Sequence, residues 1–284
     1  MSTLQNKIDF AVILRVKNAN PNGDPLNGNR PRTDYANYGE MTDVSIKRKI
    51  RDRLQESGQA IFVQSDDRKV DDAKSLRDRA EKALGSKLGS SDTADLACKT
   101  WFDVRAFGQL FALKSNKKGK KKEGGGDEEG DTGVSIGIRG PVTVQSAFSV
   151  EPIDVSSVQI TKSVSGEGDG TKRGSDTMGM KHRVDHGVYV FFGSMNPQLA
   201  EKTGFSDEDA KTIKQVLPKL FENDESSARP AGSMEILKVI WWQHNCKAGQ
   251  YSSAKVHRTL SVKPDGSYQL ESLDGLGANI LDGF

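Results

Sequence analysis

Cysteines, long apolar runs and a net charge are what this sequence has least of. Its two cysteines, Cys98 and Cys246, lack the spacing of a metal site and are too few for a disulfide framework, which favours a reducing compartment. No apolar run approaches the roughly 20 residues that a membrane-spanning helix needs. The opening residues, MSTLQNKIDF, lack the pattern of a signal peptide. We therefore predict a soluble, cytoplasmic protein that makes no membrane contact.

Motifs of the common enzyme classes are also missing. The sequence contains neither G-x-S-x-G nor a G-x-x-x-x-G-K-[ST] phosphate loop, and the glycines of SGEGDG lack the strand-to-helix context of a dinucleotide site. His182 and His186 share a segment that we interpret as a loop, without helical spacing or a cysteine partner, and His244 and His257 are isolated. We interpret all four histidines as surface, core or RNA-contacting residues, and predict no metal and no cofactor.

The overall charge does not indicate a class of binding partner. Lysine and arginine number 41 and aspartate and glutamate 39, which gives a formal net charge of +2. A nucleic-acid signal must therefore come from how the charge is distributed along the chain.

Alternation and helical spacing predict an α+β fold in a chain long enough for one large domain or two small ones. Residues 8–16, IDFAVILRV, predict a central strand, because apolar side chains occupy both of its faces. The remaining expected elements are helices over 42–54, 71–84 and 206–217, strands within 139–150, 155–164, 187–193 and 234–242, and a hairpin around Asp265-Gly266.

A low-complexity insert interrupts this pattern. Residues 114–131, KSNKKGKKKEGGGDEEGD, hold six lysines, then five carboxylates and four glycines, and cannot bury apolar surface. We predict a mobile loop here, and a solvated insertion without a specific role explains it equally well.

The strongest functional signal lies in residues 20–34, NPNGDPLNGNRPRTD. Its turn-forming pairs expose backbone N–H groups beside Arg30 and Arg32, and the next helix adds Lys47, Arg48 and Arg51 on one arc. Backbone amides, a helix N-terminus and arginines suit phosphate binding. A solvated helix face would explain the charges alone equally well.

Two further segments have a similar character. Residues 165–187, interpreted as a loop, place Lys172, Arg173, Lys181 and Arg183 around Met178 and Met180, and exposed methionines suit an unstacked base or a partner subunit. Arg139-Gly140, at the start of a strand, is a further candidate backbone clamp. Asp24 and Asp34 could hold a general acid near bound RNA, although a lone loop aspartate is far more often a turn former.

These blocks together resemble a known family. NPNGDPLNGNRPRTD with GEMTDVSIKRKIRD, then WFDVRAFGQLFA, IRGPVTVQSAFSVEPIDVSSVQIT and DTMGMKHRVDHGVY with FFG, are similar in order and content to CRISPR-associated Cas-seven backbone subunits, most closely those of type I-C Cascade complexes. The blocks cover most of residues 8–193.

The resemblance implies one domain over residues 1–284, a modified RRM-like (ferredoxin-like) palm of the RAMP superfamily. Insertions at about 55–135 and about 160–186 would form a web or finger region and a thumb. It also implies a non-catalytic subunit that polymerises head to tail along CRISPR RNA and presents the guide to a target DNA strand in antiviral defence. The implied partners are other copies of the chain and Cas-five-type and Cas-eight-type subunits.

The resemblance assigns RNA-binding roles residue by residue. Asn20, Asn22 and Gly23 would shape the loop or offer backbone contacts. The expected phosphate contacts are Arg30, Ser45, Lys47, Arg48, Arg51, Lys181 and Arg183. Met178 and Met180 would wedge against a displaced base or the neighbouring subunit, and Arg105, Arg139 and Gly140 are further candidates. Two alternatives remain: a guide-directed ribonuclease that uses Asp24 or Asp34, and an unrelated RNA-binding module.

Overall fold

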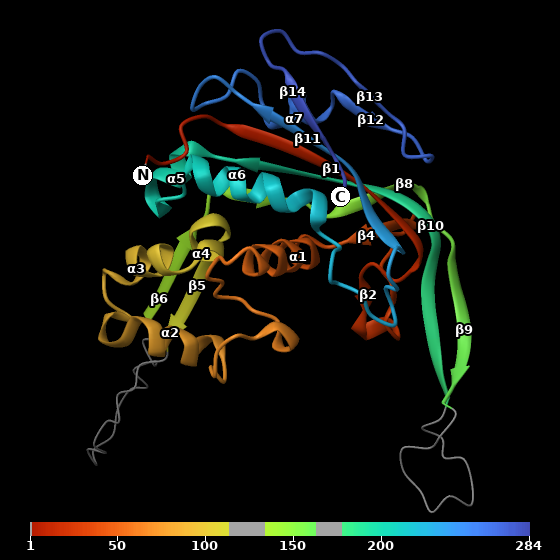
Figure 1. Ribbon diagram of the computed structural model, residues 1–284, viewed down its shortest axis with the longest axis horizontal. Helices are drawn as coiled ribbons and strands as arrows, with labels where there is room; N and C mark the ends of the chain where they lie inside the picture. The colour runs from red at the N-terminus through yellow and green to blue at the C-terminus, as the bar shows by residue number, and fades with distance from the viewer. Residues whose placement is uncertain (1, 114–133, 163–177) are drawn as a thin grey trace, which may run out of the picture.

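The computed structural model describes residues 2–113, 134–162 and 178–284 (Figure 1). The predicted mobile loop at 114–131 and much of the predicted thumb, residues 163–177, therefore lie outside the described residues. No helix of the described segments is long and apolar enough to cross a membrane.

A large antiparallel sheet forms the centre of the molecule. Strand β1 (Ile8–Ala19) lies between β10 (Met178–Met195) and β11 (Met234–Gln243), and the order across the sheet is β14-β11-β1-β10-β8-β4. Strands β7 and β9 pair with β10 outside that path. The remaining strands of this sheet are β4 (Tyr38–Met41), β7 (Val142–Val144), β8 (Ala147–Pro152), β9 (Val155–Thr161) and β14 (Ala278–Asp282). The predicted central strand is thus confirmed.

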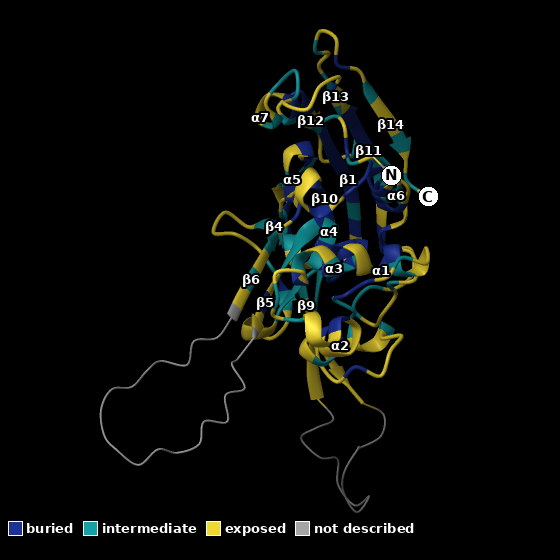
Figure 2. Cartoon of the chain, turned by 90° about the vertical axis from the view of Figure 1, so that its left-hand side faces the viewer, coloured by how far each residue is buried: buried dark blue, intermediate teal, exposed yellow. Residues whose placement is uncertain are grey.

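The two faces of β1 pack against different layers, which explains why apolar residues occupy both. Phe10, Val12 and Leu14 face helices α1 (Asp43–Glu56) and α6 (Asp207–Val216), whereas Ala11 and Ile13 face the C-terminal segment. Figure 2 shows these central strands as mostly buried. Helix α5 (Pro197–Thr203) follows β10, and short 3-10 helices occupy Pro25–Asn27, Asp66–Arg68, Gly85–Lys87 and Leu217–Lys219.

Capping residues set the helix ends. The Thr42 side chain accepts a hydrogen bond from the Ser45 amide at the start of α1, and Ser206 and Asp209 form a capping box on α6. These two predicted helices are confirmed. Helix α2 (Leu76–Leu84) begins five residues later than predicted, because Ser75 is its N-cap, and it ends at Gly85 as predicted.

The segment between α1 and β7 has a small core of its own. It contains α2, α3 (Thr93–Thr100), α4 (Phe102–Phe107) and the paired strands β5 (Gly108–Leu113) and β6 (Val134–Arg139). The Phe62 ring lies 4.6 Å from that of Trp101 and 5.3 Å from that of Phe111. Figure 1 shows this layer on the helical side of the main sheet. Most of this layer falls within residues 55–135, and the insertion expected there stays a prediction.

The C-terminal segment covers the opposite face of the sheet. Helix α7 (Ser253–His257) and the paired strands β12 (Leu260–Val262) and β13 (Tyr268–Leu270) pack there against Ile13 and Trp242. The turn at Asp265-Gly266 confirms the predicted hairpin, and Gly266 has a φ of 89°, which favours glycine. The edge strand β14 was not predicted, because its five residues show no clear alternation.

A buried carboxylate ties this C-terminal cover to β1. Asp9 is fully buried; His244 Nε2 lies 2.9 Å from its Oδ2 and Lys7 Nζ lies 3.1 Å from the same atom. His244 Nδ1 accepts the Gln250 amide at 2.9 Å, so the imidazole carries its proton on Nε2 and donates it to Asp9. Burial alone would raise the pKa of Asp9, but bonds from His257, Ser253, His244 and Lys7 together lower it. Its stabilising effect is therefore present above the ordinary carboxyl pKa of about 3.9 and is lost as the pH falls below that value.

Replacing His244 tests this cluster. We expect His244→Ala to reduce the free energy of unfolding by about 3 kcal/mol or more, because it leaves a buried carboxylate short of a donor. His186→Ala is the control, since His186 is exposed on β10, and should cost less than about 0.5 kcal/mol. Urea titration measures both. Equal losses for the two variants would contradict the assignment.

The two cysteines should differ sharply in reactivity. Cys98 is buried, and burial, with a smaller contribution from Asp95, raises the pKa of its thiol to about 11, whereas Cys246 is exposed. Iodoacetamide should therefore label Cys246 of the folded protein about a hundredfold faster than Cys98. Peptide mass spectrometry measures the two rates, and in urea both thiols should react. Rapid labelling of Cys98 in the folded protein would show that its layer opens.

Candidate nucleic-acid interface

Loop 20–34 is anchored at its first residue. The Asn20 amide donates to the Ala228 carbonyl at 2.8 Å, and its side-chain Nδ2 donates to the Asn29 carbonyl at 2.6 Å. The second bond closes the loop on itself, and Asn20 is almost fully buried. Asn20 therefore shapes the loop from within and does not present its side chain to solvent.

A second asparagine joins the loop to the start of α1. Asn22 Oδ1 accepts the Thr42 amide at 2.9 Å and the Thr42 hydroxyl at 3.0 Å. Gly23 lies so close to the neighbouring chain that a Cβ there would approach Asn29 Oδ1 to 2.0 Å. The loop thus holds one shape beside the helix N-terminus, where Ser45 is half-buried. The sequence prediction that Asn20, Asn22 and Gly23 shape the loop agrees with these contacts.

The acidic residues of the loop hold its turns. Asp24 accepts the Leu26 amide at 3.2 Å and pairs with Arg32 at 3.3 Å, within the small hairpin of β2 (Gly23–Asp24) and β3 (Arg30–Pro31). Asp34 accepts the amides of Ala36 and Tyr38 at 2.8 and 2.9 Å. Both carboxylates therefore stabilise turns.

The basic residues of α1 are paired with carboxylates inside the molecule. Lys47 pairs with Asp43 at 3.0 Å, and Arg48 lies 2.6 Å from Asp52 and 3.1 Å from Asp224. The pairing extends to the other layers of the fold, because Arg51 Nε donates to Asp103 Oδ2 at 3.0 Å and its guanidinium lies over the Phe107 ring. Loop 20–34 and this arc are neighbours, as predicted, but a phosphate here would compete with carboxylates.

Lys49 is a charged residue that the sequence analysis missed. It is buried beside Asp224, to which it is hydrogen-bonded, and burial lowers its pKa to about 8 against the opposing charge of Asp224. Arg229 reaches the same carboxylate at 2.9 Å. Arg48, Lys49 and Arg229 thus converge on Asp224. Because 175 positions separate Lys49 from Asp224 in the chain, no local signal could reveal this pairing.

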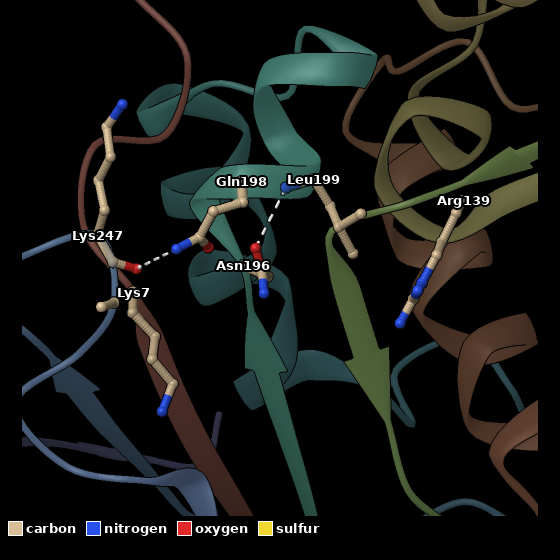
Figure 3. A pocket seen from close by; sticks show the side chains of 7 residues that line it. Lys7, Arg139, Asn196, Gln198, Leu199 and Lys247 are labelled. Carbon is tan, nitrogen blue, oxygen red and sulfur yellow. Dashed lines mark hydrogen bonds between the residues drawn. The ribbon is translucent and has the colours of Figure 1, made fainter.

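Arg105 and Arg139 have different surroundings. Arg105 makes two bonds to Asp209, at 3.1 and 2.7 Å, and lies over the Phe102 ring, so it fastens α4 to α6. Arg139 is exposed at the end of β6 and pairs with no carboxylate of the described residues. It borders an open pocket of about 380 Å³ (Figure 3), across from Asn196 and Gln198.

Gly140, next to Arg139, is required by close packing. A Cβ there would lie 2.3 Å from the Ala106 carbonyl oxygen. Its role in the fold is therefore to let two backbone segments approach each other, beside the one exposed arginine that borders this pocket.

Strands β9 and β10 leave the sheet together and form an arm beside loop 20–34 (Figure 1). Residues 178–187 were interpreted as loop but belong to β10, because residues 178–184 pair in register with β9 and residues 186 and 187 pair with β1. Met178 and Met180 are 64% and 54% exposed and stand on the same face as His182. Because side chains alternate along a strand, Lys181 and Arg183 lie on the other face, and Arg183 is 3.6 Å from Asp185. Methionines and cations therefore do not share one surface.

The inner face of the arm contacts the loop. Arg30 Nη1 donates to Ser157 Oγ at 2.9 Å and lies 3.3 Å from His182 Nδ1, so the face that carries the methionines is the face toward loop 20–34. The sequence analysis placed His182 and His186 in a loop, which is wrong, since both are on β10. Within the described residues no group of three or more histidine, cysteine or acidic side chains is arranged to hold a metal ion.

Comparison with known proteins identifies the family. The profile described as "CRISPR-associated protein Cas7" matches residues 6–276. A CRISPR-associated protein Cas7 of Haloferax volcanii is 25% identical over 99% of this chain and 82% of its own length. A chain of a solved CRISPR RNA-guided surveillance complex is similar with a TM-score of 0.46 and 18% identity, over 95% of this chain and 77% of that one. A second such complex, in a pre-nicking state, gives 0.47 and 15%, over 83% and 78%. This chain therefore belongs to the Cas7 family of CRISPR-associated proteins.

Proposed function

We propose that this chain binds CRISPR guide RNA without cleaving it and assembles head to tail along the guide in the cytoplasm. In this proposal it forms the backbone of a type I-C Cascade complex with Cas-five-type and Cas-eight-type subunits. The guide is then free to pair with a target DNA strand. The observation that carries the proposal is the surface between loop 20–34 and the arm. Two exposed methionines stand on the face of the arm that contacts the loop, and the loop is bonded to the N-terminal end of α1.

The connectivity of the central elements supports an RRM-like palm. Along the chain the order is β1, α1, β8, β10, α6 and β11, and across the sheet it is β11-β1-β10-β8. This is the 4-1-3-2 order of a ferredoxin-like unit. RRM domains stack bases on the sheet face that lacks helices. In this chain α7, β12 and β13 cover much of that face, which favours loop 20–34 and the arm as the RNA site.

Within that site we assign complementary roles. Met178 and Met180 stack against an unpaired base, and exposed backbone N–H groups of the loop, with Ser45, hold the phosphates. Arg30 contributes its Nε and Nη2, which bond to no other described residue. Lys47, Arg48 and Arg51 supply a positive surface already compensated by carboxylates, so they contribute less to affinity than their charge suggests.

Lys181 and Arg183 have a separate place in the assembly. They lie on the outer face of the arm, away from loop 20–34, beside the exposed side chains of Val158 and Ile160. We assign them to phosphates on the far side of the arm, next to the adjoining copy. Arg139, exposed and without a carboxylate partner in the described part of the chain, is the remaining candidate phosphate contact.

Assembly along RNA is tested by mass. The protein is purified alone and then with CRISPR RNAs of increasing spacer length, and native mass spectrometry counts the bound copies. We expect the number of copies to rise in steps with RNA length. A fixed stoichiometry would instead support an RNA-binding module that does not polymerise.

The methionine face gives a second prediction. Met178→Ser with Met180→Ser should weaken guide binding roughly tenfold or more, because base stacking is worth about 1–3 kcal/mol per base. The dependence of affinity on salt should not change, because no charge is removed. Val70→Ser with Leu76→Ser is the control, since these side chains are 75% and 40% exposed before and at the start of α2, outside the arm and loop 20–34. An equal loss in the control pair would contradict the assignment.

The absence of cleavage is tested directly. We expect an RNA complementary to the guide to remain intact in the assembled complex with magnesium present, because Asp24 and Asp34 are engaged in turns. Gel analysis of end-labelled RNA measures this. Cleavage that disappears in Asp24→Ala or Asp34→Ala protein would establish the guide-directed ribonuclease instead.

A further inference from the structure

The arm has little internal support. Beyond the pairing of Ala19 with Val184, the described part of β10 pairs with no strand other than β9, so residues 155–161 and 178–184 form a two-stranded ribbon. Its side chains are exposed on both faces, and Figure 2 shows its end as mostly exposed. A lone two-stranded ribbon is marginally stable in water. The direction in which the arm points must therefore be set by contacts near its base.

One side-chain cluster makes that contact. Arg30 Nη1 donates to Ser157 Oγ on β9 at 2.9 Å and lies 3.3 Å from His182 Nδ1 on β10. Ser157 Oγ is also 2.9 Å from His182 Nδ1. Among the described residues, no other side chain of loop 20–34 hydrogen-bonds to the arm. Arg30 alone thus spans the loop and both strands of the ribbon.

The cluster requires a neutral histidine. An arginine can only donate, so His182 Nδ1 must be an acceptor, and the ring proton must be on Nε2. Protonation of the imidazole removes that acceptor and places a second positive charge 3.3 Å from Arg30. The protonated imidazole and the Arg30 guanidinium then repel each other.

No carboxylate offsets that repulsion at the ring. On β10, Arg183 and Asp185 lie on the other face of the strand and pair with each other, and Lys181 shares their face. In the loop, Asp24 pairs with Arg32. On β9, Ser157 is the residue that meets the ring, and it carries no charge. The only charged group in hydrogen-bond contact with His182 in the described structure is Arg30.

We propose that Arg30 is a positioning residue that fixes the arm against loop 20–34 through neutral His182, and that acidification releases the arm. The consequence for guide binding rests on the proposed function, since the arm and the loop form the two sides of that site. The held arm presents Met178 and Met180 to the guide in the absence of RNA, so the ordering of the ribbon is completed before binding.

Pulsed dipolar EPR on the RNA-free protein tests the proposal. One spin label is placed on the exposed Cys246 and the other on Ile160→Cys, on the outer face of the arm, in a Cys98→Ala background. We expect one narrow distance distribution at about pH 7.5. It should become broad when the protein is acidified to about pH 5.5.

Three variants separate the proposed cause from a general loss of structure. Arg30→Ala should give the broad distribution at both pH values. His182→Asn keeps an acceptor near the position of Nδ1 but cannot be protonated at these pH values, so it should stay narrow at both. Arg32→Ala, which removes an arginine that bonds within the loop, should behave like the unmodified protein. A narrow distribution in Arg30→Ala, or a pH response retained in His182→Asn, would overturn the proposal.

The result of the EPR experiment does not depend on whether the proposed function is correct. The EPR measurement contains no RNA, whereas stepwise assembly is measured on guide RNA of different lengths. Stepwise assembly together with an arm that ignores Arg30 would refute only the positioning role. An arm released by acid in a protein that does not assemble along RNA would refute only the proposed function.

Discussion

The long antiparallel pairing of β1 with β10 determines the geometry of the candidate site. The two strands run together from Ile8 opposite Met195 to Ala19 opposite Val184. Beyond this point, β1 ends and loop 20–34 begins. The first residues of β10, 178–184, lie beyond the same point and belong to the arm. The shared register therefore places the loop and the arm side by side, although 120 residues lie between residue 34 and the start of β9 at residue 155. Any shift of this register would separate the two sides of the proposed RNA site.

Buried carboxylates hold separate elements of the fold together by pairing with lysine, arginine and histidine side chains. Asp103 joins α1 to the helical layer, Asp224 draws Arg48, Lys49 and Arg229 together, and Asp9 fastens the C-terminal cover. Removing one partner from such a buried group costs several kcal/mol. Arg30 and Arg139 pair with no carboxylate of the described residues, so they are left for a ligand together with backbone amides and methionines.

Local patterns in the sequence were enough to predict the main elements. Alternation indicated β1, the helical spacing of apolar residues indicated α1 and α6, and Asp265-Gly266 indicated the last hairpin. The shaping role of Asn20 and Asn22 was implied by the family resemblance. The partners of Arg48, Arg51 and Arg105 could not be predicted, because Asp224, Asp103 and Asp209 approach them only through the tertiary fold. The strand character of residues 178–187 was hidden because its alternation of methionine with polar residues gives no buried face.

The central claim is that guide RNA lies between loop 20–34 and the inner face of the arm, and hydrogen–deuterium exchange tests it most directly. Exchange is measured on the protein alone and on the protein assembled on a CRISPR RNA. The account predicts slower exchange in residues 23–32 and in β9 and β10 of the arm, with little change in α7, β12 and β13. Protection concentrated in α7, β12 and β13, with loop 20–34 unchanged, would place the RNA on the opposite face of the sheet and contradict it.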